Sequence, residues 1–306
     1  MIHIPSNARW SQEGITIAGG HGDGNALHQL FEPRSLCLDD RDGTVFIADS
    51  SNHRIVAWKQ GDNTTGRLIA GGKGRGDRMD QLNEPTDVLI DKEKDTLIIC
   101  DLENRRVMRW SLRSGTTQGE IIIDNIACRG LAMDDENNLY VTDWQKDEVR
   151  RYERGEKVGI IVAGGNGQGN GLNQLNYPTY VFVDDEGALY VSDYNNHRVM
   201  KWVKGATEGM VVAGGQGGGK DLTQLSCPGG VVVDAEGTVY VAETGNDRVT
   251  RWCKGKKKGE IIVGGNGRGE GANQFYGPNG LSFDRHGHLY VVDRLNDRVQ
   301  RFDKSS

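Results

Sequence analysis

The sequence lacks any long apolar run and any secretory signal. No 18 consecutive residues are apolar, so no segment is long enough to cross a bilayer as a helix. The opening residues, MIHIPSNARW, become polar within six positions, unlike the apolar centre of a signal peptide. We therefore expect a chain without a membrane span. It resides either in the cytosol or outside the cell after removal of a signal, and both compartments stay open.

Cysteine is scarce, and its spacing contains no C-x-x-C motif. An odd number of cysteines without paired spacing indicates neither a disulfide framework nor a zinc knuckle. Several lie in or beside apolar strand-like runs, so we expect mostly reduced core thiols, which favours a reducing compartment. A glycosylation sequon at Asn63–Thr65 favours the other compartment. The five cysteines are Cys37, Cys100, Cys128, Cys227 and Cys253.

A basic excess is also missing. The 306 residues include 37 Lys and Arg against 43 Asp and Glu, which gives a net charge of −6. Proteins that bind duplex nucleic acid do so through a basic surface, so we do not expect nucleic acid as the main partner. Hydrophobic residues make up 36% of the chain, which is enough for a substantial core.

Glycine, in contrast, is abundant and periodic. The chain has 44 glycines, and an AGG-type element is followed ten residues later by Gln and four residues after that by Pro. A second element is an acid that ends an alternating run, with an aromatic residue nine positions on. Steps of 52, 42, 50, 50 and 50 residues separate the six acids, and periods near 50 indicate a repeat architecture. The acids are Asp49, Asp101, Asp143, Asp193, Glu243 and Asp293.

Each repeat predicts four strands. Residues 178–215 contain VFVD, ALYVSD, RVMKWV and GMVVAGG, which are short alternating runs separated by turn residues and show no helical period. A four-stranded antiparallel meander repeated around an axis forms a propeller blade. Six acids thus predict an all-β, six-bladed β-propeller that spans residues 1–306 as one domain. The last repeat contains only three strands, so we expect residues 14–20, GITIAGG, to complete it and close the ring.

The acids belong to a repeated motif, D-x-x-N-x-R. The acid ends the second strand of a blade and the arginine begins the third, so a carboxylate–guanidinium bridge across the turn is the expected role. Repetition favours a structural function, because a catalytic site needs to exist only once. The copies are Asp49/Asn52/Arg54, Asp101/Asn104/Arg106, Asp193/Asn196/Arg198 and Asp293/Asn296/Arg298, with Glu243/Asn246/Arg248 as a variant.

The glycine-rich connectors between blades raise three other interpretations. The copy AGGKGRGDRMDQL at residues 70–82 contains an Arg-Gly-Asp triplet, acidic residues and phosphate-loop-like glycines. The triplet occurs in one copy only, and a phosphate loop needs a helix behind it, whereas a strand follows here. We therefore expect the glycines to serve tight turns. The following Gln–Leu pair is expected to pin the loop, with Leu packed inward and Gln bonded to loop backbone.

In a four-stranded meander, the connectors and the Asp-x-x-Asn turns share one face. The residues after each proline, where the inner strands begin, should ring the mouth of the central channel there, and concave mouths are default ligand sites. Between the second and third blades, IIIDNIACRG replaces the connector, and Lys146 and Glu148 take the Asn and Arg places. This departure is either drift or a notch in the rim. The candidate ligand residues are Arg34, Asp87, Arg129, Thr179, Tyr180 and Asn279.

The runs YVSDYNNHRVMKW, FIADSSNHRIVAW and YVVDRLNDRVQRF resemble the NHL repeat. The resemblance implies a six-bladed propeller, in a family that includes peptide-, protein- and RNA-binding modules and a zinc-dependent lyase. In that lyase the zinc-binding histidines follow the prolines. None of the corresponding residues of this chain is histidine, so we expect no zinc and no cofactor. They are Arg34, Thr86, Arg129, Thr179, Gly229 and Asn279.

The sequence therefore favours a non-enzymatic recognition scaffold. It would be a monomer that binds a peptide, a protein or another extended ligand at the channel mouth. The alternative is a metal-dependent hydrolase or lyase that uses the same mouth, for which Asp87 and Asn279 are the only ring residues with suitable oxygens.

Overall fold

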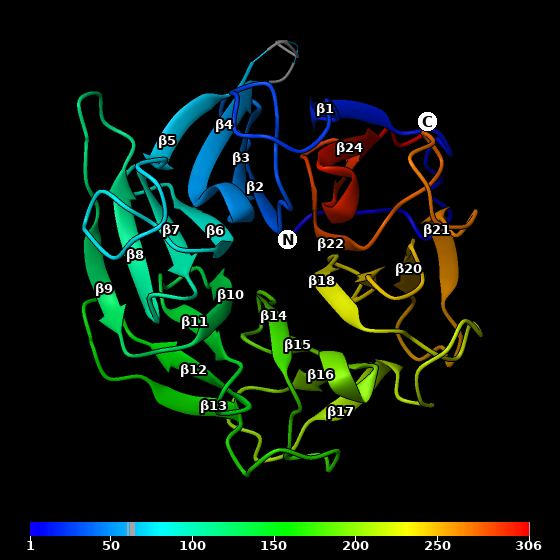
Figure 1. Ribbon diagram of the computed structural model, residues 1–306. Helices are drawn as coiled ribbons and strands as arrows, with labels where there is room; N and C mark the ends of the chain where they lie inside the picture. Colours follow the sequence, from blue (N-terminus) through cyan, green and yellow to red (C-terminus); the bar gives the residue numbers. More distant parts are fainter. Residues whose placement is uncertain (60, 62–64, 306) are drawn as a thin grey trace.

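A computed structural model, which describes residues 1–59, 61 and 65–305, contains six four-stranded antiparallel sheets arranged as a ring (Figure 1). This confirms the predicted six-bladed β-propeller. Asn63 and Thr64 of the glycosylation sequon lie outside the described residues. No described helix is long and apolar enough to span a membrane.

Each blade runs from an inner strand at the axis to an outer strand at the rim. The first three blades are β2 (Ser35–Asp39), β3 (Thr44–Asp49), β4 (Arg54–Lys59) and β5 (Arg67–Gly71); β6 (Pro85–Asp91), β7 (Thr96–Asp101), β8 (Arg106–Ser111) and β9 (Glu120–Asp124); and β10 (Cys128–Met133), β11 (Leu139–Asp143), β12 (Glu148–Tyr152) and β13 (Ile160–Gly164). The next two are β14 (Pro178–Val183), β15 (Leu189–Asp193), β16 (Arg198–Trp202) and β17 (Met210–Gly214); and β18 (Pro228–Val233), β19 (Val239–Glu243), β20 (Arg248–Trp252) and β21 (Glu260–Gly264). The sixth contains β22 (Pro278–Phe283), β23 (Leu289–Asp293), β24 (Arg298–Phe302) and β1 (Ile15–Gly19).

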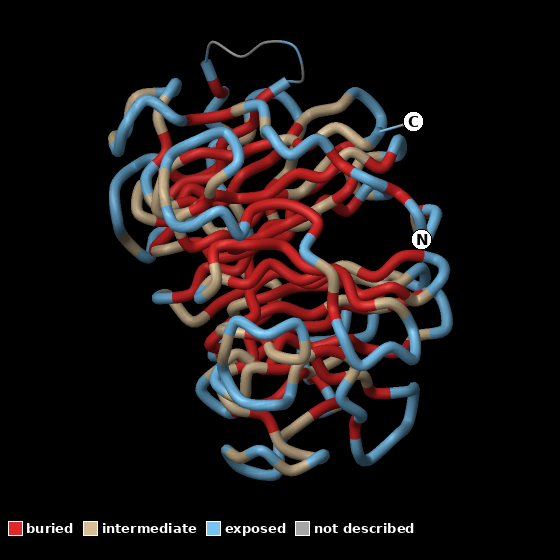
Figure 2. The backbone as a smooth tube through the Cα atoms, turned by 90° about the vertical axis from the view of Figure 1, so that its right-hand side faces the viewer, coloured by how far each residue is buried: buried red, intermediate tan, exposed pale blue. Residues whose placement is uncertain are grey.

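The core lies between the blades. Each of the six apolar clusters draws residues from two adjacent blades. Phe46 and Ile55 of the first blade, for example, pack with Val88 and Leu97 of the second. Figure 2 shows buried backbone through the middle of the ring and exposed turns at its edges. No blade buries its faces alone, so the ring has to close to complete the core.

The amino-terminal strand closes the ring, as the sequence predicts. β1 pairs antiparallel with β24, with Ile15 opposite Arg301 and Gly19 opposite Arg298. Ile17 belongs to the apolar cluster between the sixth and first blades. This closure therefore joins the two ends of the repeat array through backbone hydrogen bonds and shared core.

A segment before β1 adds a contact that the sequence analysis did not predict. Trp10 is 4% exposed and lies against Tyr240 and Phe283, with ring centroids 6.0 and 5.8 Å away. Its Nε1 donates to the carbonyl oxygen of Gly287 at 2.9 Å. Ile4 belongs to the same cluster between the fifth and sixth blades. The segment thus packs on the two blades that precede the closure.

The connector glycines have the backbone conformation expected for tight turns. Gly71 has φ +68°, and a Cβ there would lie 2.5 Å from the carbonyl oxygen of His53. Any larger residue would be strained at this φ and would collide with backbone. The Gln–Leu prediction is also confirmed: Leu82 is fully buried, and Gln81 Nε2 donates to the carbonyl of Lys73 at 3.1 Å.

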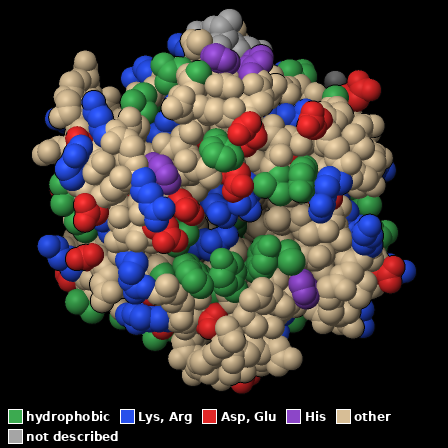
Figure 3. Space-filling model, in the orientation of Figure 1, with side chains coloured by type: hydrophobic (Ala, Val, Ile, Leu, Met, Phe, Trp, Pro, Cys, Tyr) green, Lys and Arg blue, Asp and Glu red, His purple; other side chains and the backbone are tan. Residues whose placement is uncertain are grey.

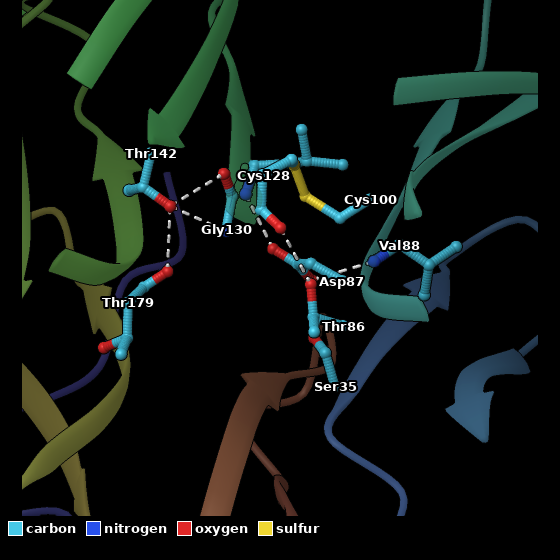
Figure 4. Close-up of a disulfide and its surroundings, with 10 residues drawn as sticks. Ser35, Thr86, Asp87, Val88, Cys100, Cys128, Gly130, Thr142 and Thr179 are labelled. Atoms are coloured by element: carbon cyan, nitrogen blue, oxygen red, sulfur yellow. Dashed lines mark hydrogen bonds between the residues drawn. A yellow bond between two sulfur atoms is a disulfide. The ribbon is translucent and has the colours of Figure 1, made fainter. Parts of the chain in front are cut away.

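The expectation of reduced core thiols is wrong for two cysteines. A disulfide joins Cys100 and Cys128, whose Cα atoms are 5.4 Å apart (Figure 4). Cys100 is the next-to-last residue of β7, and Cys128 is the first residue of β10. Their separation of 28 residues has no motif spacing. The pair becomes visible only when the second and third blades are side by side. Cys37, Cys227 and Cys253 are free.

Candidate binding site at the mouth of the ring

The repeated acid–arginine pair holds the glycine-rich connector as well as the turn. In the first blade, Asp49 accepts hydrogen bonds from Arg54 Nε at 2.6 Å and from Asn52 at 2.9 Å. The remaining guanidinium nitrogens of Arg54 donate to the carbonyls of Asn25, Ala26 and Gln29 in the connector that precedes the blade. We call this unit the connector clamp.

The connector clamp recurs in four other blades. Arg106, Arg198 and Arg298 bond to their acids at 2.6 to 2.7 Å, and Arg248 bonds to Glu243 at 2.9 Å. Each of these arginines also donates to connector carbonyls. Because these groups are buried and bonded to each other, they hold the connectors and offer little to a ligand. Burial raises the pKa of the acids Asp49, Asp101, Asp193 and Asp293.

The third blade lacks this clamp, and the missing connector explains why. An arginine at position 148 would have no connector carbonyls to bind. Glu148 stands there instead and pairs with Arg150 at 2.6 Å, while Lys146 Nζ lies 3.7 Å from Asp143. At the same boundary the Cys100–Cys128 disulfide joins the neighbouring blades. The departure is therefore a coordinated change in how two blades are joined.

Two of the candidate arginines lie at the mouth on the connector face, near enough for their charges to influence each other. Arg34 and Arg129 are both partly exposed. Arg34 Nε donates to Ser50 Oγ at 3.3 Å, and the guanidinium of Arg129 lies 4.9 Å from the ring centre of Tyr177. Among the described residues, neither has a carboxylate within ion-pairing distance. Burial, with the charges of Arg129 and Arg294, lowers the pKa of Arg34 to about 10.

Tyr180 closes the channel below these arginines. Its hydroxyl donates across the axis to the carbonyl of Arg34 at 2.7 Å, and the residue is 8% exposed. Burial and the charge of Asp87 raise its pKa. A cavity of about 800 Å³ lies beneath Tyr180 and extends to Asp40 and Asp284 in turns of the opposite face. The mouth on the connector face is consequently a shallow surface above a closed channel.

The other candidates join blades. Asp87 accepts hydrogen bonds from Ser35 Oγ at 2.6 Å and from the backbone N–H groups of Val88 and Leu131 at 2.9 and 2.7 Å (Figure 4). Burial raises its pKa to about 6. Thr179 is 2% exposed and donates to the carbonyl of Pro228 at 3.2 Å. Asn279 is also buried, at 7% exposed. These groups therefore face protein and not the open mouth.

Three aromatic side chains beside Arg129 were missed by the sequence analysis. The ring of Tyr177 lies 5.0 Å from that of Trp144 and 5.6 Å from that of Tyr194, and all three residues are partly exposed. We call them the aromatic row. In Figure 3, Lys and Arg side chains gather at the centre of the ring, with hydrophobic side chains beside them over β10 and β14. This places an aromatic surface next to the guanidinium of Arg129.

A signal for this row does exist in the sequence. The residue after each repeated acid is Ser50, Leu102, Trp144, Tyr194, Thr244 or Arg294, and the residue before each proline position is Glu32, Glu84, Ala127, Tyr177, Cys227 or Gly277. Aligned around the ring, these positions put the aromatic residues in adjacent blades three and four.

A metal site is not evident in the described part of the chain, where no three His, Cys, Asp or Glu side chains are grouped closely enough to hold an ion. The mouth instead presents guanidinium groups and aromatic rings. These groups bind anions and planar or apolar groups.

Comparisons with known proteins agree with this architecture. A family model described as the NHL repeat matches residues 32–58, 175–202 and 225–252. No curated protein matches the chain.

Similar solved structures are related at low identity. An auxiliary nutrient binding protein from Bacteroides thetaiotaomicron is 15% identical, with a TM-score of 0.74 over 97% of this chain and 78% of its own. Virginiamycin B lyase from Staphylococcus aureus is 11% identical, with a TM-score of 0.58 over 91% and 97%. A chain of a nidogen–laminin complex is 16% identical, with a TM-score of 0.60 over 82% and 84%. At these identities the likeness concerns the fold, and together with the repeat matches it identifies the chain as a six-bladed β-propeller that carries NHL repeats.

Proposed function

We propose that this propeller is a recognition scaffold whose connector face binds a carboxylate-bearing segment of a peptide or protein. The observation that carries the proposal is the pair Arg34 and Arg129. Both lie at the mouth, and neither has a carboxylate partner among the described residues. Arginine forks suit carboxylates because two parallel N–H···O bonds can form at once.

The electrostatics of the mouth support an anionic ligand. Burial and, after it, the charges of Arg129 and Arg294 lower the pKa of Arg34, so guanidinium groups that repel one another stand near each other at the mouth. An anion placed between two guanidinium groups relieves this repulsion. Partial burial strengthens the interaction, because fewer water molecules screen it.

The shape of the surface favours an extended ligand over a small molecule. Tyr180 closes the channel directly below Arg34, and the cavity beneath it has its lining in the inner strands and in turns of the opposite face. Small-molecule sites are usually enclosing clefts, whereas a shallow surface suits a segment of chain that lies across it.

The alternative, a hydrolase or lyase that uses the mouth, has less support. Its candidate carboxylate, Asp87, already accepts three hydrogen bonds from protein donors. A general base or metal ligand needs a carboxylate oxygen that faces the ligand.

The binding proposal can be tested with a pool of fluorescein-labelled octapeptides rich in Glu and Asp, and a matched Gln and Asn pool. We expect the acidic pool to bind and the amide pool not to bind. The double variant Arg34→Ala/Arg129→Ala should bind the acidic pool at least tenfold more weakly, because a hydrogen bond to a charged group contributes about 1.5–3 kcal/mol. Arg113→Ala, in an exposed turn of the opposite face, is the control and should bind normally.

Truncation of Arg34 leaves its carbonyl in place, so the bond from Tyr180 can persist in the variant. Circular dichroism and melting curves should therefore stay close to those of the unmodified chain. Equal binding of both pools, or acidic binding that is unchanged in the double variant, contradicts the proposal.

A further inference from the structure

We infer that the mouth binds an acidic residue of the ligand together with a neighbouring aromatic residue. The aromatic side chain of the ligand would lie on the aromatic row formed by Trp144, Tyr177 and Tyr194. The inference rests on the proposed function and assigns the chemistry of its ligand. Trp144 lies 5.0 Å from Tyr177, which lies 4.9 Å from the guanidinium of Arg129. The anion-binding group and the aromatic surface are thus in direct contact.

The missing connector leaves the turn that carries Trp144 without a loop over it. In the clamped blades the Asn of the turn donates to a connector glycine carbonyl, as Asn52 does to Gly24 at 2.8 Å, so a loop lies over the turn. Trp144 lies in the corresponding turn of the third blade, where that connector is absent. Five of the six tryptophans are buried in the core, whereas Trp144 is partly exposed. A partly exposed tryptophan is typical of a binding hot spot.

Positive charge at the mouth lies beside the aromatic row. Arg129 and Lys146, which is 49% exposed in its side chain, lie on the third blade. On the first blade, Glu32 is already ion-paired with Arg294, whereas Arg34 is not in an ion pair among the described residues. An acidic side chain is therefore attracted to the part of the mouth between Arg34 and the third blade. The acidic group and the aromatic row must share one part of the mouth.

Tyr177 holds Arg129 for this task. When a guanidinium stacks on an aromatic ring, the ring covers one flat face of the guanidinium. The N–H groups point outward in the plane of the guanidinium, so they stay free to donate. Arg129 can then donate to a carboxylate while the neighbouring rings take an apolar or planar group. Aromatic pairs contribute beyond the area they bury when their rings are tilted or offset.

The connector before the sixth blade contains a pair of the same composition whose arginine already has a carboxylate partner. The guanidinium of Arg268 lies 4.4 Å from the ring centre of Tyr276, but it is also paired with Asp247 at 3.3 Å. An Arg–Tyr stack alone is therefore not the site. The combination at the third blade differs because its arginine is not ion-paired with any described carboxylate and its tyrosine continues into a row of rings.

Three acetylated and amidated, fluorescein-labelled octapeptides test the inference: one with a central Glu-Tyr, one with Glu-Ala and one with Gln-Tyr. We expect the Glu-Tyr peptide to bind at least tenfold more tightly than either of the others. Trp144→Ala should remove the preference for Glu-Tyr over Glu-Ala and leave the weaker Arg129-dependent binding. Trp144→Phe should restore part of the preference, and Tyr276→Ala should leave it intact.

The fluorescence of Trp144 gives an independent readout. Because the other tryptophans are buried, acrylamide quenching of the exposed fraction should fall when the Glu-Tyr peptide is bound and should be unchanged by Gln-Tyr. The reduction should disappear in Trp144→Phe.

The remaining outcomes overturn the inference in different ways. Equal, Arg129-dependent binding of Glu-Tyr and Glu-Ala contradicts the aromatic partner and leaves the proposed function standing. No binding of any Glu peptide contradicts both. Tight binding of a labelled decauridylate that depends on Arg129 and Trp144 indicates a single-stranded nucleic acid, since bases also stack on aromatic rings, and overturns the peptide assignment.

Discussion

Cys100 on the second blade is disulfide-bonded to Cys128 on the third, at the boundary where the glycine-rich connector is missing. Cys128 occupies the position that proline holds in the other five blades. The other blade-to-blade connections use a loop and an arginine clamp, whereas this one uses a covalent bond. The disulfide thus joins these two blades in place of the absent clamp. Its second cysteine, Cys128, immediately precedes Arg129 at the mouth.

The first prediction concerns this bond. Cys100→Val/Cys128→Ala should lower the free energy of unfolding by about 3–4 kcal/mol, the loss of chain entropy estimated for a closed loop of this length. Thermal unfolding with and without reductant measures the effect, and reductant should destabilise the unmodified chain alone. Cys227→Ala, at a free thiol, is the control. The assignment is wrong if mass spectrometry finds all five cysteines alkylated without reduction.

The second prediction concerns the connector clamp. Arg198 bonds to Asp193 at 2.6 Å and to the connector carbonyls of Asn170, Gly171 and Gln174. Arg198→Ala leaves a buried carboxylate without its partner, and we expect a loss of about 3–5 kcal/mol.

Arg198→Lys tests the geometry of the clamp and not only its charge. Lysine keeps the charge but cannot reach several acceptors with one planar fork, so it should recover only part of the stability. Chemical denaturation gives the free energies. A lysine variant as stable as the unmodified chain would show that charge alone matters, and Arg113→Ala should be near neutral.

The sequence predicts the repeated parts of this structure well, because six copies reinforce one pattern. The spacing of the acids predicts six blades, and the incomplete last repeat predicts that residues 14–20 join it. The pairing of Asp49 with Arg54 follows from their places on either side of a turn. The connector carbonyls that Arg54 also binds do not follow, because backbone acceptors leave no trace in residue identity.

The unrepeated parts of the mouth are harder to predict, because each occurs once. Trp144 and Tyr177 come together from different blades, so their contact depends on the angle between blades and not on spacing along the chain. Tyr180 follows the proline as the mouth residues do, but its length carries its hydroxyl across the axis to Arg34. Cys100 and Cys128 likewise meet only in the closed ring.

The third prediction is a pH dependence centred on Asp87. Its pKa is about 6 in the folded protein, against an ordinary value of 3.8, because the carboxyl is buried. Between these two pH values the carboxyl of Asp87 keeps a proton in the folded state that it has released in the unfolded state. The stability that this proton contributes is therefore fully present below pH 4 and is lost as the pH rises through 6. The difference corresponds to at most about 3 kcal/mol.

Asp87→Asn isolates this contribution. The other buried acids are present in both proteins and cancel in the comparison, so the melting temperature of the unmodified chain should fall relative to that of the variant between pH 4 and 7. A difference in melting temperature that stays constant between pH 4 and 7 would show that the pKa of Asp87 is not raised.

The fourth prediction concerns closure of the ring by the amino-terminal segment. Deletion of residues 1–20 removes β1 and leaves β24 with an unpaired edge, which is a template for association with other chains. It also uncovers Tyr240 and Phe283, which Trp10 covers in the intact protein. We expect aggregation or a strongly lowered melting temperature, measured by light scattering and calorimetry.

Single substitutions separate the two halves of this segment. Trp10→Ala should cost about 3–5 kcal/mol, as is usual for a large buried aromatic residue, while β1 stays paired. Thr16→Pro instead fixes φ within β1, at the pair with Gln300, away from the extended value of a strand and should destabilise the closure itself. Because the six apolar clusters each span two blades, either loss should lower the stability of the whole ring in one cooperative transition. A deletion variant that melts like the full chain would show that blade six is stable with three strands and that closure depends on other contacts.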